Sequence, residues 1–587
     1  MGYLNIHVSQ KTALVLLALC VVIAAQAIVI NFLFLENAKS DISPDQDTLK
    51  TTALQLYFEI DPAASVFRSS QTISLMNSET IRRDMTFLIS PSLIIDRLDF
   101  KNSQGDPLVV EDWHYSTPVQ YPHLSGTVVL NQVLVHFAQD LESGQALTLS
   151  LDYHLPRASF QTGPGTNLYE LFVSPQVQHA VGFDSGAFPV IEPDGAVPLE
   201  IKIRHPDSER CAIPGEQVAE ELDGHFMTVT YQVSQAYDPA FACAVFHKQQ
   251  KTIDGDTVEF YLTPDQSYSE VMSDIALQYF KLYRRLFGDP GNHNFRFVFM
   301  PANVEGSAVN KGNIVYLGTT GSFENIDHDQ DRQMAFKIMV GHEEFKNWSG
   351  FQGSSSGSLI DWWSEGGANF MSAWAGETLW GKEFGRKART QYLMDLNHAL
   401  GYQTPGTLET AGAFSDKNSG QGEWILAYDY GALVWEQLRQ LMGDAALQAG
   451  VSEFIQQSAQ QKGTVAVLIQ ILQRHTQADV TAFLKQWTVR VARIDLTIQQ
   501  VTLQAAGSQY EATVVIDVAA DKDYEFITSL GYTTDASDEL TLVPVHITRQ
   551  GDSIVKFTTP HRPTTFQIDP EVSVPQTNLR NDYWPVR

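Results

Sequence analysis

Two hydrophobic periodicities divide the chain. Between residues 51 and 251, apolar and polar residues alternate in short β-branched runs that end at Pro, Gly, Asn or Asp, as antiparallel strands do. The same two-residue period returns over 494–587, whereas after residue 323 the middle of the chain spaces apolar residues by three and four positions, which is typical of amphipathic helices. The pattern predicts an α+β multidomain chain: an N-terminal β-sandwich-like domain (51–251), a mainly helical domain (252–493) and a small C-terminal β-sandwich (494–587).

A different pattern precedes these domains. Residues 12–35 are apolar and uncharged, which at about 1.5 Å per residue is long enough to span a bilayer. Lys11 precedes this run, and residues 36–47 carry four acidic residues and one lysine, so the positive-inside rule assigns residues 1–11 to the cytoplasm. We predict a single-pass signal anchor, a linker over 36–50, and a large C-terminal part that is periplasmic or extracellular. Ala25-Gln26-Ala27 leaves open the alternative of a cleaved signal peptide.

Charge and cysteine content narrow the choice of partners and compartment. The chain has 39 Lys and Arg against 68 Asp and Glu, a formal net charge of -29. This charge repels phosphate backbones, so nucleic acid is excluded as an expected partner. Cys20 lies in the predicted anchor, which leaves Cys211 and Cys243 as the one pair available for a disulfide in an oxidising compartment. Two buried free thiols are the alternative.

Candidate chemistry appears at residues 342–346, His-Glu-Glu-Phe-Lys. A helix with His-Glu-x-x-His places two imidazoles on one face, where both reach one Zn²⁺, and its Glu deprotonates the metal-bound water. Here His342 and Glu343 fill the first ligand position and the base position. Lys346 stands at the second ligand position, and its ammonium has no lone pair for a metal at neutral pH.

A second carboxylate, Glu365, follows Lys346 by nineteen residues within Trp-Trp-Ser-Glu-Gly. At these residues the sequence resembles the aminopeptidase N family of gluzincin zinc metallopeptidases, whose pattern is His-Glu-x-x-His, eighteen residues, then Glu. The resemblance implies a thermolysin-like fold for 252–493, His342 and Glu365 as zinc ligands, and Glu343 as the catalytic base. The Phe345-x-x-Trp348 pair is also similar to the related glycyl aminopeptidases, so the subfamily stays open.

Two further segments carry the resemblance. Residues 428–432, Tyr-Asp-Tyr-Gly-Ala, resemble the family's Tyr-x-Lys-Gly-Ala, which implies that the Tyr428 phenol stabilises a tetrahedral oxyanion. A second segment stands where the family has Gly-Ala-Met-Glu-Asn, the substrate-binding strand, and it consists of Gly306, Ser307, Ala308, Val309 and Asn310. Val309 replaces the glutamate that pairs with a substrate ammonium, so the preference for free amino termini should be lost.

The lysine in the motif changes what the zinc site is expected to do. His342 and Glu365 are two protein ligands, where a catalytic zinc has three plus water, so zinc should bind weakly or not at all. One hypothesis is that the Lys346 ammonium takes the place of the metal and neutralises Glu343 and Glu365. The alternative is that Lys346 points into solvent and the motif is decaying.

These features together predict a function class. We expect a membrane-anchored, outward-facing homologue of aminopeptidase N-type enzymes that binds peptides or protein termini, with weak or no turnover. The alternative is an active zinc-dependent peptidase that hydrolyses peptides with metal-activated water.

Overall fold

The computed structural model describes residues 49–585 apart from short internal segments. The segments outside the description are 78–80, 124–125, 163–167, 192–195, 237, 301–306, 319–322, 324, 350–358, 360, 403–405, 409–424 and 459–462. The predicted tail and anchor, and most of the predicted linker, fall at residues 1–48 and therefore also lie outside the described residues. Among the helices that the structure does describe, none is both long enough and apolar enough to cross a bilayer.

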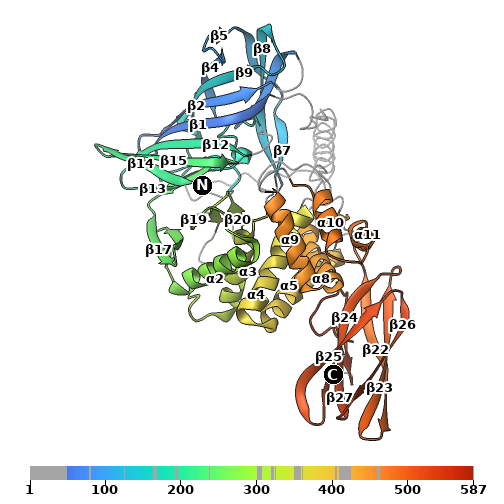
Figure 1. Ribbon diagram of the computed structural model, residues 1–587. Coiled ribbons are helices and arrows are strands. Elements are labelled where there is room, and N and C mark those ends of the chain that lie inside the picture. The colour runs from blue at the N-terminus through green and yellow to red at the C-terminus, as the bar shows by residue number, and fades with distance from the viewer. Residues whose placement is uncertain are drawn as a thin grey trace, which may run out of the picture.

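The N-terminal part is built from strands (Figure 1). An eight-stranded sheet has the order β14-β15-β12-β1-β2-β9-β4-β5, and smaller sheets have the orders β3-β8-β6, with β7 beside β8, and β10-β11-β16-β13. Side chains alternate between buried and half-buried along strands such as β9, as expected for strands with one face in a core. The bounds are β1 (Lys50–Asp61), β2 (Val66–Met76), β3 (Arg82–Ile89), β4 (Ile94–Asn102), β5 (Pro107–Leu108), β6 (Val110–Tyr115), β7 (Val119–His123), β8 (Gly126–Leu141), β9 (Ala146–His154), β10 (Phe172–Val173), β11 (Val177–Val181), β12 (Val197–Pro206), β13 (Arg210–Ala212), β14 (Glu216–Asp223), β15 (Phe226–Ala236) and β16 (Ala240–Ala244).

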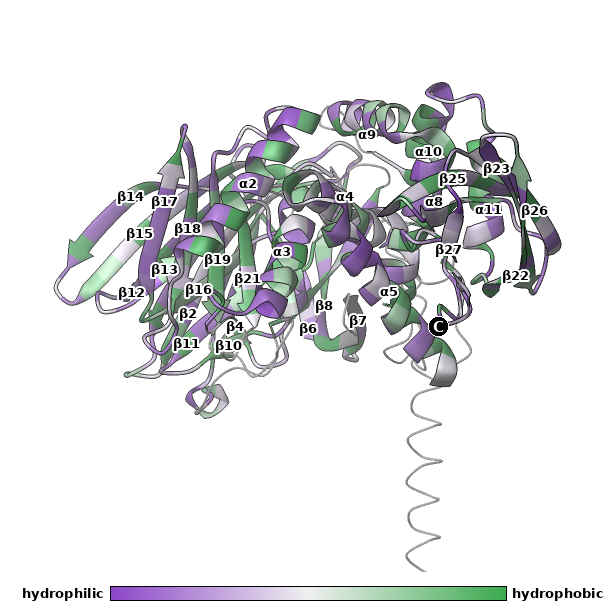
Figure 2. Cartoon of the chain, turned by 90° about the horizontal axis from the view of Figure 1, so that it is seen from below, coloured by the Kyte–Doolittle hydropathy of each residue, from purple (hydrophilic) through white to green (hydrophobic). Residues whose placement is uncertain are grey.

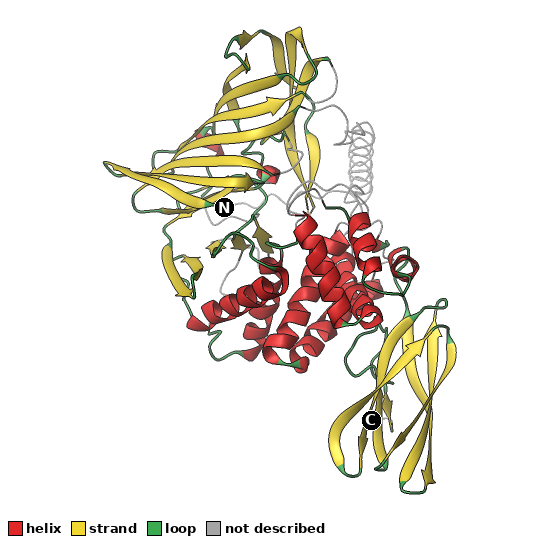
Figure 3. Ribbon diagram, viewed as in Figure 1, coloured by secondary structure: helices red, strands yellow, loops and turns green. Residues whose placement is uncertain are grey.

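The middle part combines a five-stranded sheet with helices. The sheet has the order β17-β18-β19-β21-β20, so β17 and β20 are its two edges. Figure 3 shows the helices gathered between the N-terminal strands and the C-terminal strands. The bounds are β17 (His247–Ile253), β18 (Asp256–Leu262), α2 (Glu270–Phe287), β19 (Asn294–Met300), β20 (Ser307–Asn310), β21 (Ile314–Gly318), α3 (Gln330–Phe345), the π-helical turn η3 (Trp362–Gly366), α4 (Gly367–Trp380), α5 (Lys382–Tyr402), the π-helical turn η4 (Leu426–Tyr430), α8 (Gly431–Met442), α9 (Asp444–Ser458), α10 (Val465–Arg474) and α11 (Val480–Thr488).

The five-stranded sheet lies between two hydrophobic cores. Phe297 and Phe299 of β19 pack into the core that contains the helices. Their neighbour Val298, with Met300 and Tyr316, packs into the core of the N-terminal strands. A strand buried on both faces has a continuous apolar sequence, because no face needs polar side chains.

The C-terminal part is a pair of small sheets that share the core of the helices. One sheet has the order β22-β23-β26, and the other has the order β25-β24-β27-β28. The bounds are β22 (Ile494–Ala506), β23 (Gln509–Ala520), β24 (Phe526–Thr534), β25 (Ser537–Ile547), β26 (Gly551–Thr559), β27 (Pro563–Ile568) and β28 (Tyr583–Trp584).

The predicted fold class, with its mainly helical catalytic-type domain of thermolysin-like kind, is wrong, whereas the predicted membrane helix falls on residues outside the described ranges. The structure is 45% strand and 28% helix and contains several sheets, and none of its described helices could span a membrane. The helices α3 to α11 follow residue 323, as the periodicity indicates, but residues 256–318 of the predicted helical domain contribute strands β18, β19, β20 and β21 of the five-stranded sheet. The short strands β17, β20 and β21 were not predicted. β21 is buried along its whole length and shows no two-residue period, and the described part of β20 is only four residues long.

Cys211 and Cys243 form a disulfide that joins β13 to β16. The two cysteines are direct neighbours in the antiparallel pairing of these strands. The bond therefore fixes the short strand β13 against the longer chain segment that leads into β17.

Candidate functional site

Helix α3 brings the motif residues into the interior. Asp329 caps its first turn by accepting hydrogen bonds from the backbone of Asp331 and Arg332. At the other end of the helix, residues 340–345 are all buried. A Cβ atom at Gly341 would lie 2.5 Å from the ring of Tyr279, so only glycine allows α3 to pack this closely on α2. The packing buries His342 and Glu343 with exposed fractions of 5% and 4%.

Two π-helical turns supply the other motif residues. Glu365 lies in η3 and Tyr428 lies in η4. The turns touch through backbone, because a Cβ atom at Gly366 would lie 2.6 Å from the Ala427 carbonyl oxygen and 2.9 Å from Gly431 Cα. π-helical turns interrupt regular helices and occur often at functional sites. Here they place a carboxylate and a phenol beside α3.

The four charged or ionisable motif residues His342, Glu343, Lys346 and Glu365 form one group, which we call the Lys346 cluster. Lys346 Nζ lies 2.9 Å from Glu365 Oε2 and 3.8 Å from Glu343 Oε2. His342 Nε2 lies 3.1 Å from Glu365 Oε2 and 3.8 Å from Glu343 Oε1. The Lys346 side chain is only 15% exposed, so its ammonium lies between the two carboxylates and not in solvent.

The charges in this cluster stabilise one another. Burial lowers the pKa of Lys346, but the negative charges of Glu343 and Glu365 outweigh it and raise the pKa above its usual value. Burial likewise raises the pKa of Glu365, and the charge of Lys346 together with the hydrogen bond from His342 reverses that effect and lowers the pKa. Lys346 and Glu365 therefore form a buried ammonium–carboxylate pair.

Tyr428 and Asn369 complete the surroundings of His342. The Tyr428 ring stacks on the imidazole with a centroid distance of 5.6 Å and an interplanar angle of 1°. Burial, followed by the charges of Glu365, Tyr169 and Glu343, raises the pKa of Tyr428 well above its usual value, so the phenol stays protonated. Asn369 donates from Nδ2 to Asp429 Oδ1 at 3.3 Å, which turns its oxygen toward His342 Nδ1 at 2.7 Å.

The donor set does not fit a catalytic zinc ion. Such an ion needs three protein ligands and a water molecule. His342 Nδ1 faces an amide oxygen and Nε2 faces a carboxylate oxygen, so both ring nitrogens face acceptors and neither is directed at an open position. Lys346 adds a positive charge and no lone pair. Within the described residues, no group of three or more His, Cys, Asp and Glu side chains could hold a metal ion.

The predicted substrate-binding segment is brought to the site only in part. Asn310, the last residue of the edge strand β20, donates from Nδ2 to the Glu343 carbonyl oxygen at 2.8 Å. Ala308 packs against the core of the helices, whereas Val309 is 7% exposed and belongs to the core of the N-terminal strands. Gly306 lies outside the described residues, and of Ser307 only the backbone pairing with Gly318 is described.

Several residues near the cluster were missed by the sequence analysis. Asp361 precedes Glu365 by four residues and Asn369 follows it by four, a helical spacing that could have identified both. Lys311 pairs with Asp238 from the N-terminal part, and Tyr169 contributes to the electrostatic surroundings of Lys346. No motif contains these last three residues, and no local pattern in the sequence connects them.

Some buried acceptors at the site have no hydrogen-bond partner among the described residues. They are Glu343 Oε2, Asn310 Oδ1 and Asp361 Oδ2. Buried polar atoms in proteins are almost always satisfied by protein, water or ligand. These oxygens are therefore suited to accept hydrogen bonds from N–H or O–H groups of a bound molecule.

Comparison of the chain with models of known protein families found no match, and comparison with curated proteins found none either. The likeness to aminopeptidase N-type enzymes therefore rests on the motif residues quoted above.

Proposed function

We propose that the protein binds peptides at a peptidase-type site whose metal has been replaced by the ammonium of Lys346, and that it has little or no hydrolytic turnover. The observation that carries the proposal is the position of Lys346 Nζ between Glu365 and Glu343. Zinc catalysis depends on a Lewis acid that lowers the pKa of bound water to about 7. An ammonium supplies charge without a coordination position, so Glu343 would have no activated water to deprotonate.

The peptide-binding half of the proposal is supported by strand β20. This strand is the last in its sheet, so one of its edges has no strand partner among the described residues. An extended peptide can add to such an edge through main-chain hydrogen bonds. Asn310, at the end of this strand, is hydrogen-bonded to Glu343, and each of these residues has a buried side-chain oxygen without a hydrogen-bond partner among the described residues. Peptides or protein termini outside the cytoplasm are the proposed partners, with the predicted anchor holding the protein at the membrane.

Zinc content tests the metal replacement. The purified full chain is incubated with zinc, dialysed and assayed for bound metal and for hydrolysis of an aminoacyl reporter. We expect far less than one zinc per chain in the wild type, and about one in Lys346→His, which restores three protein ligands. Lys337→His is the matched control, because it adds an imidazole to α3 away from the cluster. Stoichiometric zinc in the wild type, or turnover that a chelator abolishes, would show an active zinc peptidase instead.

Peptide binding tests the edge strand. A mixture of labelled nonapeptides should be retained by the wild-type chain, and retention should fall in Asn310→Leu, which loses the free acceptor and the bond to the Glu343 carbonyl. Peptides with N-methyl groups at alternate residues should bind poorly, since they cannot complete the ladder of main-chain hydrogen bonds. Equal retention of N-methylated and unmodified peptides contradicts binding by strand addition.

A further inference from the structure

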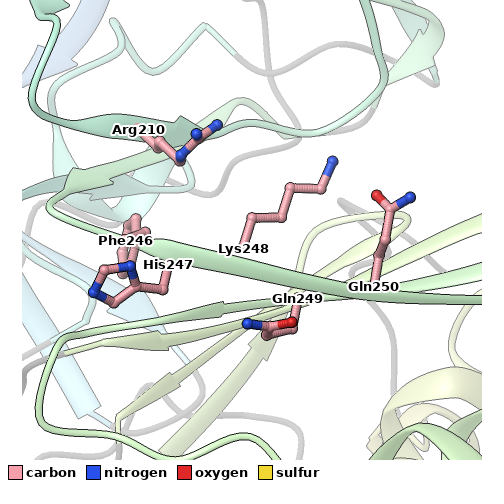
Figure 4. A pocket seen from close by; sticks show the side chains of 6 residues that line it. All are labelled: Arg210, Phe246, His247, Lys248, Gln249 and Gln250. Carbon is pink, nitrogen blue, oxygen red and sulfur yellow. The ribbon is translucent and has the colours of Figure 1, made fainter.

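The opposite edge of the same sheet borders a pocket. It lies between β13 and β17 and has a volume of about 430 Å³ (Figure 4). No acidic side chain lines it, although the chain as a whole has a net charge of -29. The lining residues are Arg210, Phe246, His247, Lys248, Gln249 and Gln250.

Three of these side chains lie on one side of β17. Figure 4 shows Lys248 and Gln250 projecting toward Arg210, whereas His247 and Gln249 project to the other side of the strand. This alternation is that of any β-strand. The disulfide of the next residue, Cys211, ties β13 to β16 and fixes the backbone at Arg210.

The pocket carries an excess of positive charge. Lys248 Nζ lies 2.6 Å from Glu259 Oε1, and Arg296 Nε lies 3.2 Å from Glu259 Oε2, so one buried carboxylate is shared by two cations. Arg296 also donates to the backbone carbonyls of Ile213 and Gly215, which fixes this layer beneath the pocket. The exposed Arg210 side chain has no hydrogen-bond or ion-pair partner in the described part of the chain. These cations are suited to an anionic ligand.

Strand β17 adds main-chain groups to this charge. It is the first strand in its sheet, so in the described structure its outer edge has no strand partner. Figure 2 shows β17 as a mainly hydrophilic strand, and its first four residues are exposed. A bare edge strand accepts an added strand.

We propose that the pocket between β13 and β17 binds an extended peptide segment that carries carboxylate side chains. The segment pairs with the free edge of β17, and one of its carboxylates accepts hydrogen bonds from the Arg210 guanidinium and from Lys248. Arg210 is the specificity-determining residue, because a guanidinium binds a carboxylate through two parallel hydrogen bonds. The inference does not depend on the Lys346 cluster, which lies beside the other edge strand.

The test uses the full chain and a fluorescently labelled heptapeptide in which Glu and Thr alternate, with a Gln-Thr peptide of the same length as the neutral probe. We expect saturable binding of the Glu peptide and weak binding of the Gln peptide. Arg210→Gln should weaken binding of the Glu peptide by about tenfold, the effect of one hydrogen-bonded charge pair. Gln250→Glu should weaken binding of the Glu peptide more than Arg210→Gln does, because it adds a carboxylate that repels those of the peptide. Arg549→Gln, an exposed arginine of the C-terminal part, is the matched control and should bind as the wild type does.

Three results would overturn the inference. Equal affinity for the two peptides would show that charge does not select the ligand. Unchanged affinity in Arg210→Gln, with the thermal midpoint also unchanged, would place the peptide elsewhere. Displacement of the peptide by an equal concentration of inorganic phosphate would show that the pocket binds a free oxyanion and not a peptide.

Discussion

Two groups of buried charge in the helical region are built differently. In the Lys346 cluster, one ammonium faces two carboxylates, and Glu343 Oε2 has no hydrogen-bond partner among the described residues. The second group, which we call the Arg389 network, consists of Glu377, Arg389, Glu436 and Arg439.

In the Arg389 network, two guanidiniums face two carboxylates. Arg389 lies 2.6 Å from Glu377 and 3.6 Å from Glu436, and Arg439 lies 2.9 Å and 3.3 Å from the same two carboxylates. None of the buried side-chain atoms without a hydrogen-bond partner in the described structure belongs to these four residues. In the Arg389 network, positive and negative charges are equal in number and the side chains are hydrogen-bonded, which stabilises the fold. In the Lys346 cluster, the carboxylates outnumber the ammonium and one oxygen lacks a hydrogen bond, which suits the cluster to binding.

The largest loss of stability is expected when a substitution disrupts the Arg389 network. Arg389→Met leaves the buried Glu377 and Glu436 to share one guanidinium, and removing one partner of a buried ion pair costs about 3–5 kcal/mol. Urea-induced unfolding should show this as a large fall in the midpoint. Lys382→Met is the control, because Lys382 is 81% exposed in its pair with Glu571 and such a pair contributes less than about 1 kcal/mol. Equal shifts in the two variants would contradict the role assigned to the network.

The next prediction uses a carboxyl group at the border of the Lys346 cluster. Burial and the charge of Glu365 raise the pKa of Asp361 to about 7 from its usual 3.8, while Lys346 opposes the shift. Between these values the folded chain binds a proton that the unfolded chain has lost. Stability therefore falls as the pH rises from 3.8 to about 7, with a slope of up to about 1.4 kcal/mol per pH unit.

The Asp361→Asn variant lacks this contribution. Its stability relative to the wild type should increase from pH 5 to pH 7 and then level off, as measured by unfolding midpoints across that range. Parallel curves for the two proteins would show that Asp361 is ionised in the folded state throughout.

The smallest expected effect distinguishes the two groups most sharply. Glu343→Gln removes a charge that attracts Lys346 at 3.8 Å but also repels Glu365, and one oxygen of this carboxylate has no hydrogen-bond partner in the described structure, so stability should change by less than about 1 kcal/mol. Glu436→Gln, the matched change in the Arg389 network, should lower stability because two arginines lose a charged partner. A loss of stability in Glu343→Gln as large as in Glu436→Gln would remove the contrast.

The site was predictable from sequence where its residues follow local spacing. His342, Glu343 and Lys346 share one helix, and Glu365 and Tyr428 were identified from short motifs, and the structure brings all five together. Their roles in binding or catalysis stay proposals, and so do the domain boundaries.

The parts that the sequence did not reveal depend on long-range packing. Lys311 and Asp238 form an ion pair across 73 residues of sequence, and neither lies in a motif. The five-stranded sheet was missed as a unit because the described part of its edge strand β20 has only four residues and β21 is buried along its whole length without polar alternation. A periodicity argument detects one exposed face, and β21 has none.

The contact between Gly366 and Gly431 makes the geometry of the site sensitive to any side chain at position 366. The two glycines contact each other through main-chain atoms only, so the turns that carry Glu365 and Tyr428 pack directly against each other. A methyl group at position 366 would push the two turns apart. It would thereby separate the Glu365 carboxylate from the Tyr428 phenol without removing any polar atom. The arrangement of Glu365 and Tyr428 therefore depends on the absence of a side chain at position 366.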